Sequence, residues 1–91
     1  MMDDRTVLIT GAAHGLGACM AAHAARAGYR VGVMDLDADG CAALADRLQN
    51  AVSLPADVCD PESVEEALNV LGSVPDVLIN NAGILRTGPL I

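Results

Sequence analysis

The sequence predicts an α/β protein in which a parallel β-sheet carries helices on both of its faces. Short apolar runs rich in valine, leucine and isoleucine alternate with longer segments of helical periodicity. Strands separated by helices are joined by right-handed crossovers, which make the strands parallel. The composition agrees, because 53% of the 91 residues are hydrophobic although the chain has one Tyr and no Phe or Trp. A core of small and aliphatic side chains suits helices packed closely on a buried sheet.

The first strand and the first helix are predicted at the start of the chain. The apolar run at residues 7–9 ends at Thr10-Gly11, as expected for a buried strand. We expect the next helix over residues 15–27, with Gly28 as its left-handed stop. Its apolar face would hold the residues that recur at helical spacing: Leu16, Met20, Ala24 and Ala27.

The second strand and helix follow the same pattern. The strand expected at residues 30–36 has three inward side chains: Val31, Val33 and Met34. Asp37 or Asp39 can cap the following helix, and Asn50 is its expected stop. This helix would bury one stripe at helical spacing: Cys41, Leu44, Ala45 and Leu48.

The rest of the chain predicts one more helix between two strands. A strand at residues 52–54 continues towards Asp57, and a fourth strand is expected at residues 76–80. Residues 60–62 combine an aspartate cap, a proline at the first helical position and a glutamate in the first turn. The helix would end at Gly72 and bury one stripe: Val64, Ala67, Leu68 and Leu71.

Charge and composition exclude several classes of function. The net charge is −7, the five basic residues are scattered arginines, and the chain has no lysine. Nucleic acids and anionic membranes both require a clustered basic patch, so we expect neither as a partner. Residues 6–25 contain no acid, lysine or arginine, but their glycines, histidines and many alanines argue against a membrane span.

The cysteines and the amino terminus favour a cytoplasmic location. The spacing of Cys19, Cys41 and Cys59 fits no zinc-binding pattern, so we expect no metal site. An odd number of cysteines in an acidic chain favours reduced thiols, whose simplest role is that of small buried side chains. The first five residues lack the basic segment of a signal peptide.

The glycine-rich stretch from Thr10 to Gly17 is the most informative segment. It lies where the first strand ends and a helix begins, and the unpaired first amides of a helix attract anions. Gly11 would permit the turn, Gly15 would leave room for a phosphate, and Gly17 would let the helix pack closely. The spacing G-x-x-x-G-x-G differs from the usual G-x-G-x-x-G, and a plain strand–helix turn is the alternative. His14 could lie near a phosphate when protonated, or could simply be solvated.

Asp35 lies at the end of the second predicted strand, 18 residues after Gly17. Dinucleotide-binding folds carry an acid about 20 residues past the glycine loop, where it accepts hydrogen bonds from the adenosine ribose. A carboxylate there repels a 2′-phosphate, so NAD is expected as the cofactor rather than NADP. The alternative is an ordinary loop acid, because Asp37 and Asp39 follow it.

Polar residues also follow the third and fourth predicted strands. Asp57 and Val58 follow the third strand, and the stretch from Asn80 to Gly83 follows the fourth. Open α/β sheets bind their ligands at such carboxyl ends. Asp57 could accept from an adenine amino group while Val58 packs on the ring, and the asparagines suit a loop near a ribose. Each has a structural alternative, because an acid can precede a helix and asparagines form turns.

Together these motifs resemble the short-chain dehydrogenase/reductase family, in its short single-domain branch. Residues 10–17 are similar to the family's T-G-x-x-x-G-[IL]-G, residues 57–58 to its adenine-contacting D-V pair, and residues 80–83 to its N-N-A-G. The resemblance implies a Rossmann-type sheet of strand order 3-2-1-4, with Asn80 bracing the central strands. It also implies a set of cofactor-binding residues: Gly11, Ala13, His14, Gly15, Leu16, Gly17, Asp35, Asp57, Val58, Asn81 and Gly83.

The family resemblance implies hydride exchange between a nicotinamide cofactor and a small-molecule alcohol or carbonyl substrate. A tyrosine, a lysine four residues later and a serine carry this chemistry in the family, and none of them maps onto this chain. Tyr29 precedes the second predicted strand and is expected to be structural. The sequence therefore predicts no catalytic residue among those given.

The predicted fold is incomplete. Three helices cover four strands only in part, and in the order 3-2-1-4 the last strand is an uncovered edge. We expect residues 1–91 to be the N-terminal part of one dinucleotide-binding domain, truncated after its fourth strand, from an enzyme that is a homo-oligomer when intact. The alternative is a non-catalytic nucleotide-binding module that docks a partner chain through the edge strand and an apolar end: Ile84, Leu85, Leu90 and Ile91.

Overall fold

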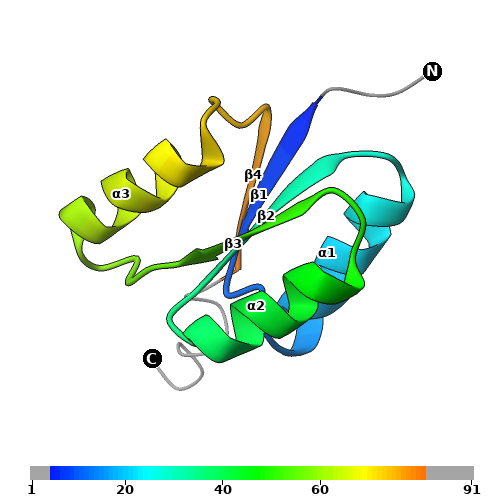
Figure 1. Cartoon of the computed structure of the whole chain (residues 1–91), viewed down its shortest axis with the longest axis horizontal. Coiled ribbons are helices and arrows are strands. Elements are labelled where there is room, and N and C mark those ends of the chain that lie inside the picture. Colours follow the sequence, from blue (N-terminus) through cyan, green and yellow to red (C-terminus); the bar gives the residue numbers. More distant parts are fainter. Residues whose placement is uncertain (1–4, 82–91) are drawn as a thin grey trace, which may run out of the picture.

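Strands and helices alternate strictly along residues 5–81, which are the residues that this computed structural model describes. The elements are β1 (Thr6–Thr10), α1 (Gly15–Arg26), β2 (Arg30–Asp35), α2 (Ala38–Arg47), β3 (Ala51–Pro55), α3 (Pro61–Leu71) and β4 (Val77–Asn80). The strands form one parallel sheet in the order β3-β2-β1-β4 (Figure 1). The predicted fold class and strand order are confirmed.

Helices cover both faces of the sheet. α1 and α2 lie on one face and α3 lies on the other (Figure 1). The core under α1 and α2 consists of Val7, Ile9, Ala12, Ala21, Val31, Val33, Cys41 and Leu44. The core under α3 consists of Leu8, Met34, Leu54, Ala56, Ala67 and Leu71. Alternate residues of β1 enter opposite cores, as expected for a strand that is buried on both faces.

The helix ends follow local sequence signals. Of the two candidate caps for α2, Asp37 is the one used, because its Oδ1 accepts from the Gly40 amide at 3.0 Å. Asp60 caps α3 by accepting from the Glu62 amide at 3.1 Å. Gly72 ends α3 in the left-handed conformation at φ +80°. The predicted boundaries of α3 are therefore confirmed.

α1 buries a different stripe from the predicted one. Its fully buried residues are Gly17 and Ala21, whereas Leu16 is 55% exposed and Ala27 is exposed as well. The other two predicted residues are only partly buried. The helix presents its smallest side chains to the sheet, because these allow the closest approach of the two backbones.

β3 is shorter than predicted. It ends at Pro55 and does not continue to Asp57. The Asp57 carboxylate accepts from the Cys59 amide at 2.9 Å, which turns the chain away from the sheet.

Only one of the three cysteines is a buried side chain, so the expectation for the other two is wrong. Cys41 lies in the core under α2, and burial raises the pKa of its thiol to about 11. Cys19 and Cys59 are exposed, and all three thiols are free. The described residues contain no cluster of three or more His, Cys, Asp or Glu side chains that could hold a metal ion.

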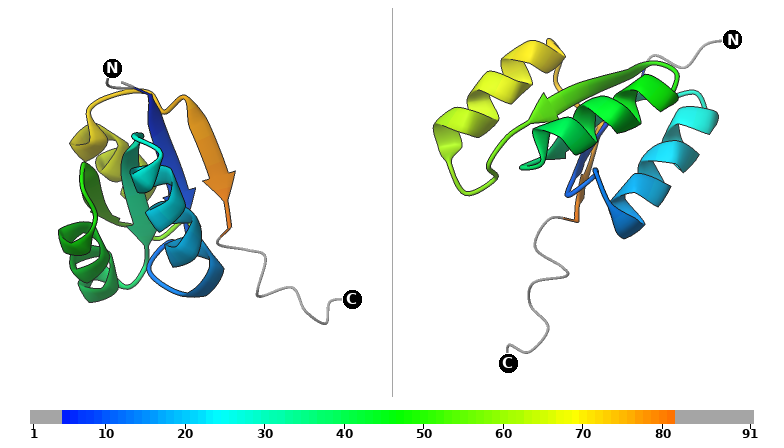
Figure 2. Two further views of the ribbon diagram at one scale, coloured as in Figure 1. Left: turned by 90° about the vertical axis from the view of Figure 1, so that its right-hand side faces the viewer. Right: turned by 60° about the horizontal axis from the view of Figure 1, so that its bottom comes forward.

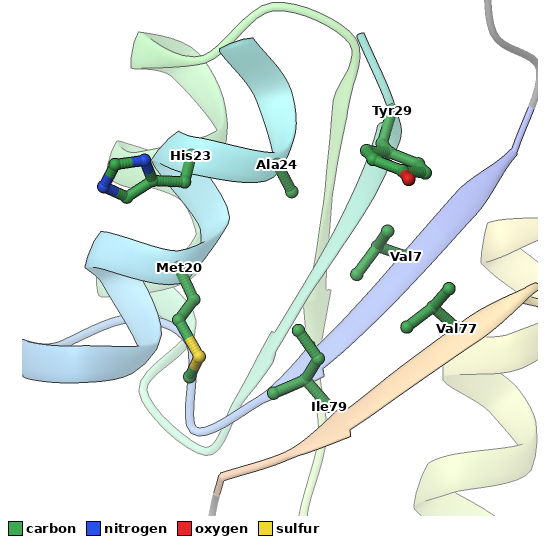
Figure 3. Close-up of a pocket in the computed structure, with 7 residues that line it drawn as sticks. All are labelled: Val7, Met20, His23, Ala24, Tyr29, Val77 and Ile79. Carbon is green, nitrogen blue, oxygen red and sulfur yellow. The ribbon is translucent and has the colours of Figure 1, made fainter. Parts of the chain in front are cut away.

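β4 forms an edge of the sheet, as predicted (Figure 2). Val77 and Leu78 are exposed, and Leu78 retains 60% of its accessible surface. An apolar groove of about 410 Å³ lies between α1 and the strands β1 and β4, lined by Val7, Met20, His23, Ala24, Tyr29, Val77 and Ile79 (Figure 3). Within residues 5–81, no helix has the length and hydropathy needed to cross a bilayer.

Candidate functional site

The predicted site residues gather at the carboxyl edge of the sheet. The glycine loop follows β1, Asp35 ends β2, Asp57 follows β3 and Asn81 follows β4. In the sheet register, Thr10 pairs with Met34 on one side and with Asn80 on the other. The parallel strands therefore bring four separate motifs to one edge. Gly83 lies outside the described residues.

The loop between β1 and α1 leaves open space beside Gly15. Gly11 and Gly15 adopt left-handed backbones, with φ of +64° and +56°. A Cβ placed on Gly15 would have no atom of the described residues within 4 Å. His14 is the extended N-cap residue of α1, and its side chain makes no capping hydrogen bond to that helix. The first turn of α1 thus begins at a site that a phosphate group can approach.

Gly17 packs against the loop and the end of β4. A Cβ placed there would collide with the Gly11 carbonyl oxygen, and would lie 2.8 Å from Asn81 Nδ2 and 2.9 Å from Ala12 Cα. No side chain fits at this position without moving backbone atoms. The close packing expected of Gly17 is present, and the loop itself is what the helix packs against.

Hydrogen bonds from the end of β4 hold the glycine loop. Thr10 Oγ1 donates to Asn80 Oδ1 at 2.9 Å and accepts from the Asn81 amide at 2.9 Å. Asn81 Nδ2 donates to the Gly11 carbonyl at 3.1 Å. Asn81 is only 2% exposed, and its Oδ1 has no hydrogen-bond partner among the described residues. The Asn80 side chain thus joins the ends of β1 and β4, in line with its expected role of bracing the central strands. The Asn81 side chain points into the protein.

Asp35 bridges the glycine loop and the start of α2. Its Oδ2 accepts from the Ala13 amide at 3.1 Å, and its Oδ1 accepts from the Asp37 amide at 3.0 Å. The carboxylate is partly buried. The Ala13 amide, one of the predicted phosphate donors, is therefore already hydrogen-bonded within the protein.

His14 and Asp37 form an exposed pair beside the loop. His14 Nε2 lies 2.7 Å from Asp37 Oδ2. The Gly40 amide and the His14 imidazole hold the pKa of the Asp37 carboxyl below its ordinary value. From the sequence, Asp37 was expected only as a possible cap of α2.

Leu36, which was expected to end the second strand, is a further exposed residue at this edge. It follows Asp35 directly and is 74% exposed, whereas Val58, after the neighbouring strand β3, is 45% exposed. A large apolar side chain between two acids at the end of a strand is the signal that could have revealed it. The carboxyl ends of β2 and β3 therefore present one exposed apolar side chain each.

Sequence and structure comparisons match one protein family. The profile of the family described as short chain dehydrogenase matches residues 5–91. The chain belongs to the short-chain dehydrogenase family. It is 36% identical to D-threitol dehydrogenase of Mycolicibacterium smegmatis over 95 aligned residues. The alignment covers 97% of this chain and 36% of that protein.

Solved structures of short-chain dehydrogenase-like proteins share the fold. A 3-oxoacyl-[acyl-carrier protein] reductase with bound NAD from Brucella melitensis is 34% identical with a TM-score of 0.80, covering 85% of this chain and 31% of that one. The Pseudomonas aeruginosa RhlG/NADP complex is 34% identical with a TM-score of 0.78, covering 87% of this chain and 34% of that one. The chain spans about a third of the length of these relatives. The resemblance stated from the sequence is confirmed at the level of family and fold.

Proposed function

We propose that this chain supplies the cofactor-binding part of a nicotinamide-dependent oxidoreductase. The observation that carries the proposal is the open left-handed loop at Gly15, at the start of α1, in a chain whose relatives include enzymes with bound NAD or NADP. Residues 1–91 would form the N-terminal part of one dinucleotide-binding domain. The relatives from Mycolicibacterium smegmatis and Brucella melitensis are named as a dehydrogenase and a reductase, and these names do not favour the alternative of a non-catalytic module.

The pyrophosphate would lie against the first turn of α1. The amides of this turn have no intrahelical acceptors, and the positive end of the helix dipole favours an anion there. The donors would come from His14, Gly15 and Leu16, because the Ala12 and Ala13 amides already donate to Met34 O and Asp35 Oδ2.

The adenosine would lie across the ends of β2 and β3. Asp35 would accept from the ribose hydroxyls, which favours NAD over NADP because a carboxylate repels a 2′-phosphate. Leu36 and Val58 are exposed at neighbouring strand ends, so their apolar surfaces can contact the faces of the adenine ring, with Asp57 near its amino group. Asn81 would act by holding Gly11, and Gly83 would border the riboses as the family pattern implies.

The bound nicotinamide would supply or take up a hydride, and the residues of this chain would fix its position. The substrate would be a small alcohol or carbonyl compound. That none of the given residues corresponds to the family's catalytic tyrosine, lysine and serine stays a prediction of the sequence. A homo-oligomeric assembly and a cytoplasmic location stay predictions of the sequence.

A pair of glycine substitutions tests the phosphate site. Gly15→Ala and Gly28→Ala both place a methyl group on a left-handed backbone, with no described atom within 4 Å, at opposite ends of α1. Both should lose about 1–2 kcal/mol of stability from backbone strain. Only Gly15→Ala should weaken NAD binding, by about 10- to 100-fold, because the methyl group displaces a phosphate from charge-assisted hydrogen bonds.

Calorimetric titration of the complete protein with NAD and NADP gives the readout. Equal NAD affinities for the Gly15→Ala and Gly28→Ala variants would show that no phosphate approaches Gly15. Binding of NADP as tight as that of NAD would show that Asp35 does not select the cofactor.

A further inference from the structure

Positive charge in the described residues lies at the opposite edge of the sheet from the glycine loop. The strands begin and the helices end at that amino edge, and all four described arginines lie there, at strand starts or in last helical turns: Arg5, Arg26, Arg30 and Arg47. His23 also lies in the last turn of α1. Within residues 5–81, His14 is therefore the one side chain at the carboxyl edge that can carry a positive charge.

Asp37 holds this histidine. His14 Nε2 lies 2.7 Å from Asp37 Oδ2, while Asp37 Oδ1 accepts from the Gly40 amide at 3.0 Å. The cap fixes the carboxylate, and the first turn of α2 lies against the loop, since a Cβ on Gly40 would sit 3.0 Å from Ala13 Cβ. The pair therefore has a defined geometry although both side chains are exposed.

Other charged groups around His14 are acidic. Asp35, at the end of β2, directs its carboxylate to the Ala13 amide, next to His14 in the chain. Asp39 lies in the first turn of α2, and the first turn of α1 contains no acid. An anion that approaches from the side of β2 and α2 thus meets carboxylates, with the imidazole as its sole cationic contact in the described part of the chain.

We propose that Asp37 is a specificity residue that acts through His14 to disfavour NADP. By pairing with the imidazole, Asp37 neutralises the cation that a 2′-phosphate would otherwise use. Backbone hydrogen bonds to both oxygens of Asp35 hold its carboxylate beside the loop. The preference for NAD would then rest on two carboxylates, Asp35 and Asp37. The inference rests on the proposed function, because it assumes that the adenosine ribose lies beside Asp35.

Asp37→Asn is the informative variant, because asparagine caps a helix as well as aspartate does and the fold is kept. In the complete protein, the NADP affinity relative to NAD should rise about two- to fivefold, the range that exposed ion pairs give. Wild type and variant are compared at the same pH, because the 2′-phosphate titrates.

Two control variants test whether the change in relative NADP affinity acts through His14. Asp39→Asn removes the same charge from the first turn of α2, at a residue that is not hydrogen-bonded to His14 in the described structure, and should change the ratio by less than about twofold. His14→Gln combined with Asp37→Asn should abolish the gain. An equal gain in Asp39→Asn, or a gain that persists in the double variant, would show general charge repulsion and overturn the inference.

The outcomes separate this inference from the proposed function. An unchanged ratio in Asp37→Asn, with NAD still bound, would overturn the inference alone. Failure of the wild-type protein to bind either dinucleotide would overturn the proposed function.

Discussion

Replacing Gly17 with alanine sets two effects against each other. Alanine is more favourable than glycine within a helix by up to about 1 kcal/mol. The new Cβ, however, would collide with the Gly11 carbonyl oxygen and lie 2.9 Å from Ala12 Cα. Ordinary contact begins at 3.4 Å, so the loop backbone must move to admit the methyl group. Such overpacking costs about 1–3 kcal/mol, so after the gain in helix propensity we expect a net loss of up to about 2 kcal/mol.

Urea unfolding of the complete protein measures this balance. A loss of this size lowers the urea concentration at the unfolding midpoint by up to about 1 M, for a slope near 2 kcal/mol/M. NAD affinity should also fall, because the displaced backbone carries the phosphate donors. Gly32→Ala is the matched control, since its Cβ meets the flexible ends of Leu54 and Leu8 at 2.9 and 3.1 Å. A Gly17→Ala variant that is more stable than wild type would refute the packing argument.

Two further predictions concern buried groups. Asn81→Asp replaces the donor to the Gly11 carbonyl with an acceptor in a buried position, and should lower the free energy of unfolding by about 1–3 kcal/mol in urea titrations. An unchanged urea midpoint for the Asn81→Asp variant would contradict this prediction. Because the pKa of the Cys41 thiol is raised to about 11, thiol reagents at about pH 8 should modify the two exposed cysteines in the folded protein and reach Cys41 only after denaturation. Peptide mapping that finds all three thiols equally reactive would contradict that.

Much of the fold could be predicted because its signals are local. The Asp60-Pro61 start and the Gly72 stop of α3 each act within one helical turn. The order β3-β2-β1-β4 was predicted from the alternation of strands and helices and from the family resemblance. The left-handed backbones of Gly11 and Gly15 agree with the turn that the glycine spacing predicts.

Other features depend on contacts between distant parts of the chain. The stripe of α1 could not be predicted from hydropathy, because Gly17 and Ala21 face the sheet for their small size while Leu16 remains exposed. The His14–Asp37 pair joins residues 23 positions apart, and periodicity carries no information about such a pair.

The Asn81 side chain depends on long-range packing in the same way. Its Nδ2 donates to the Gly11 carbonyl, 70 positions earlier in the chain, a contact that was not expected from the sequence. The expectation that Asn81 lies beside a ribose stays a prediction. A turn-forming residue can serve either role, and only the sheet order places it against the glycine loop.

A crystal structure of the complete protein with NAD tests the central claim most directly. The account predicts the pyrophosphate within hydrogen-bond distance of the amides at the start of α1, with Gly15 Cα in contact with a phosphate oxygen. A dinucleotide bound elsewhere, or protein atoms filling the space beside Gly15, would contradict it.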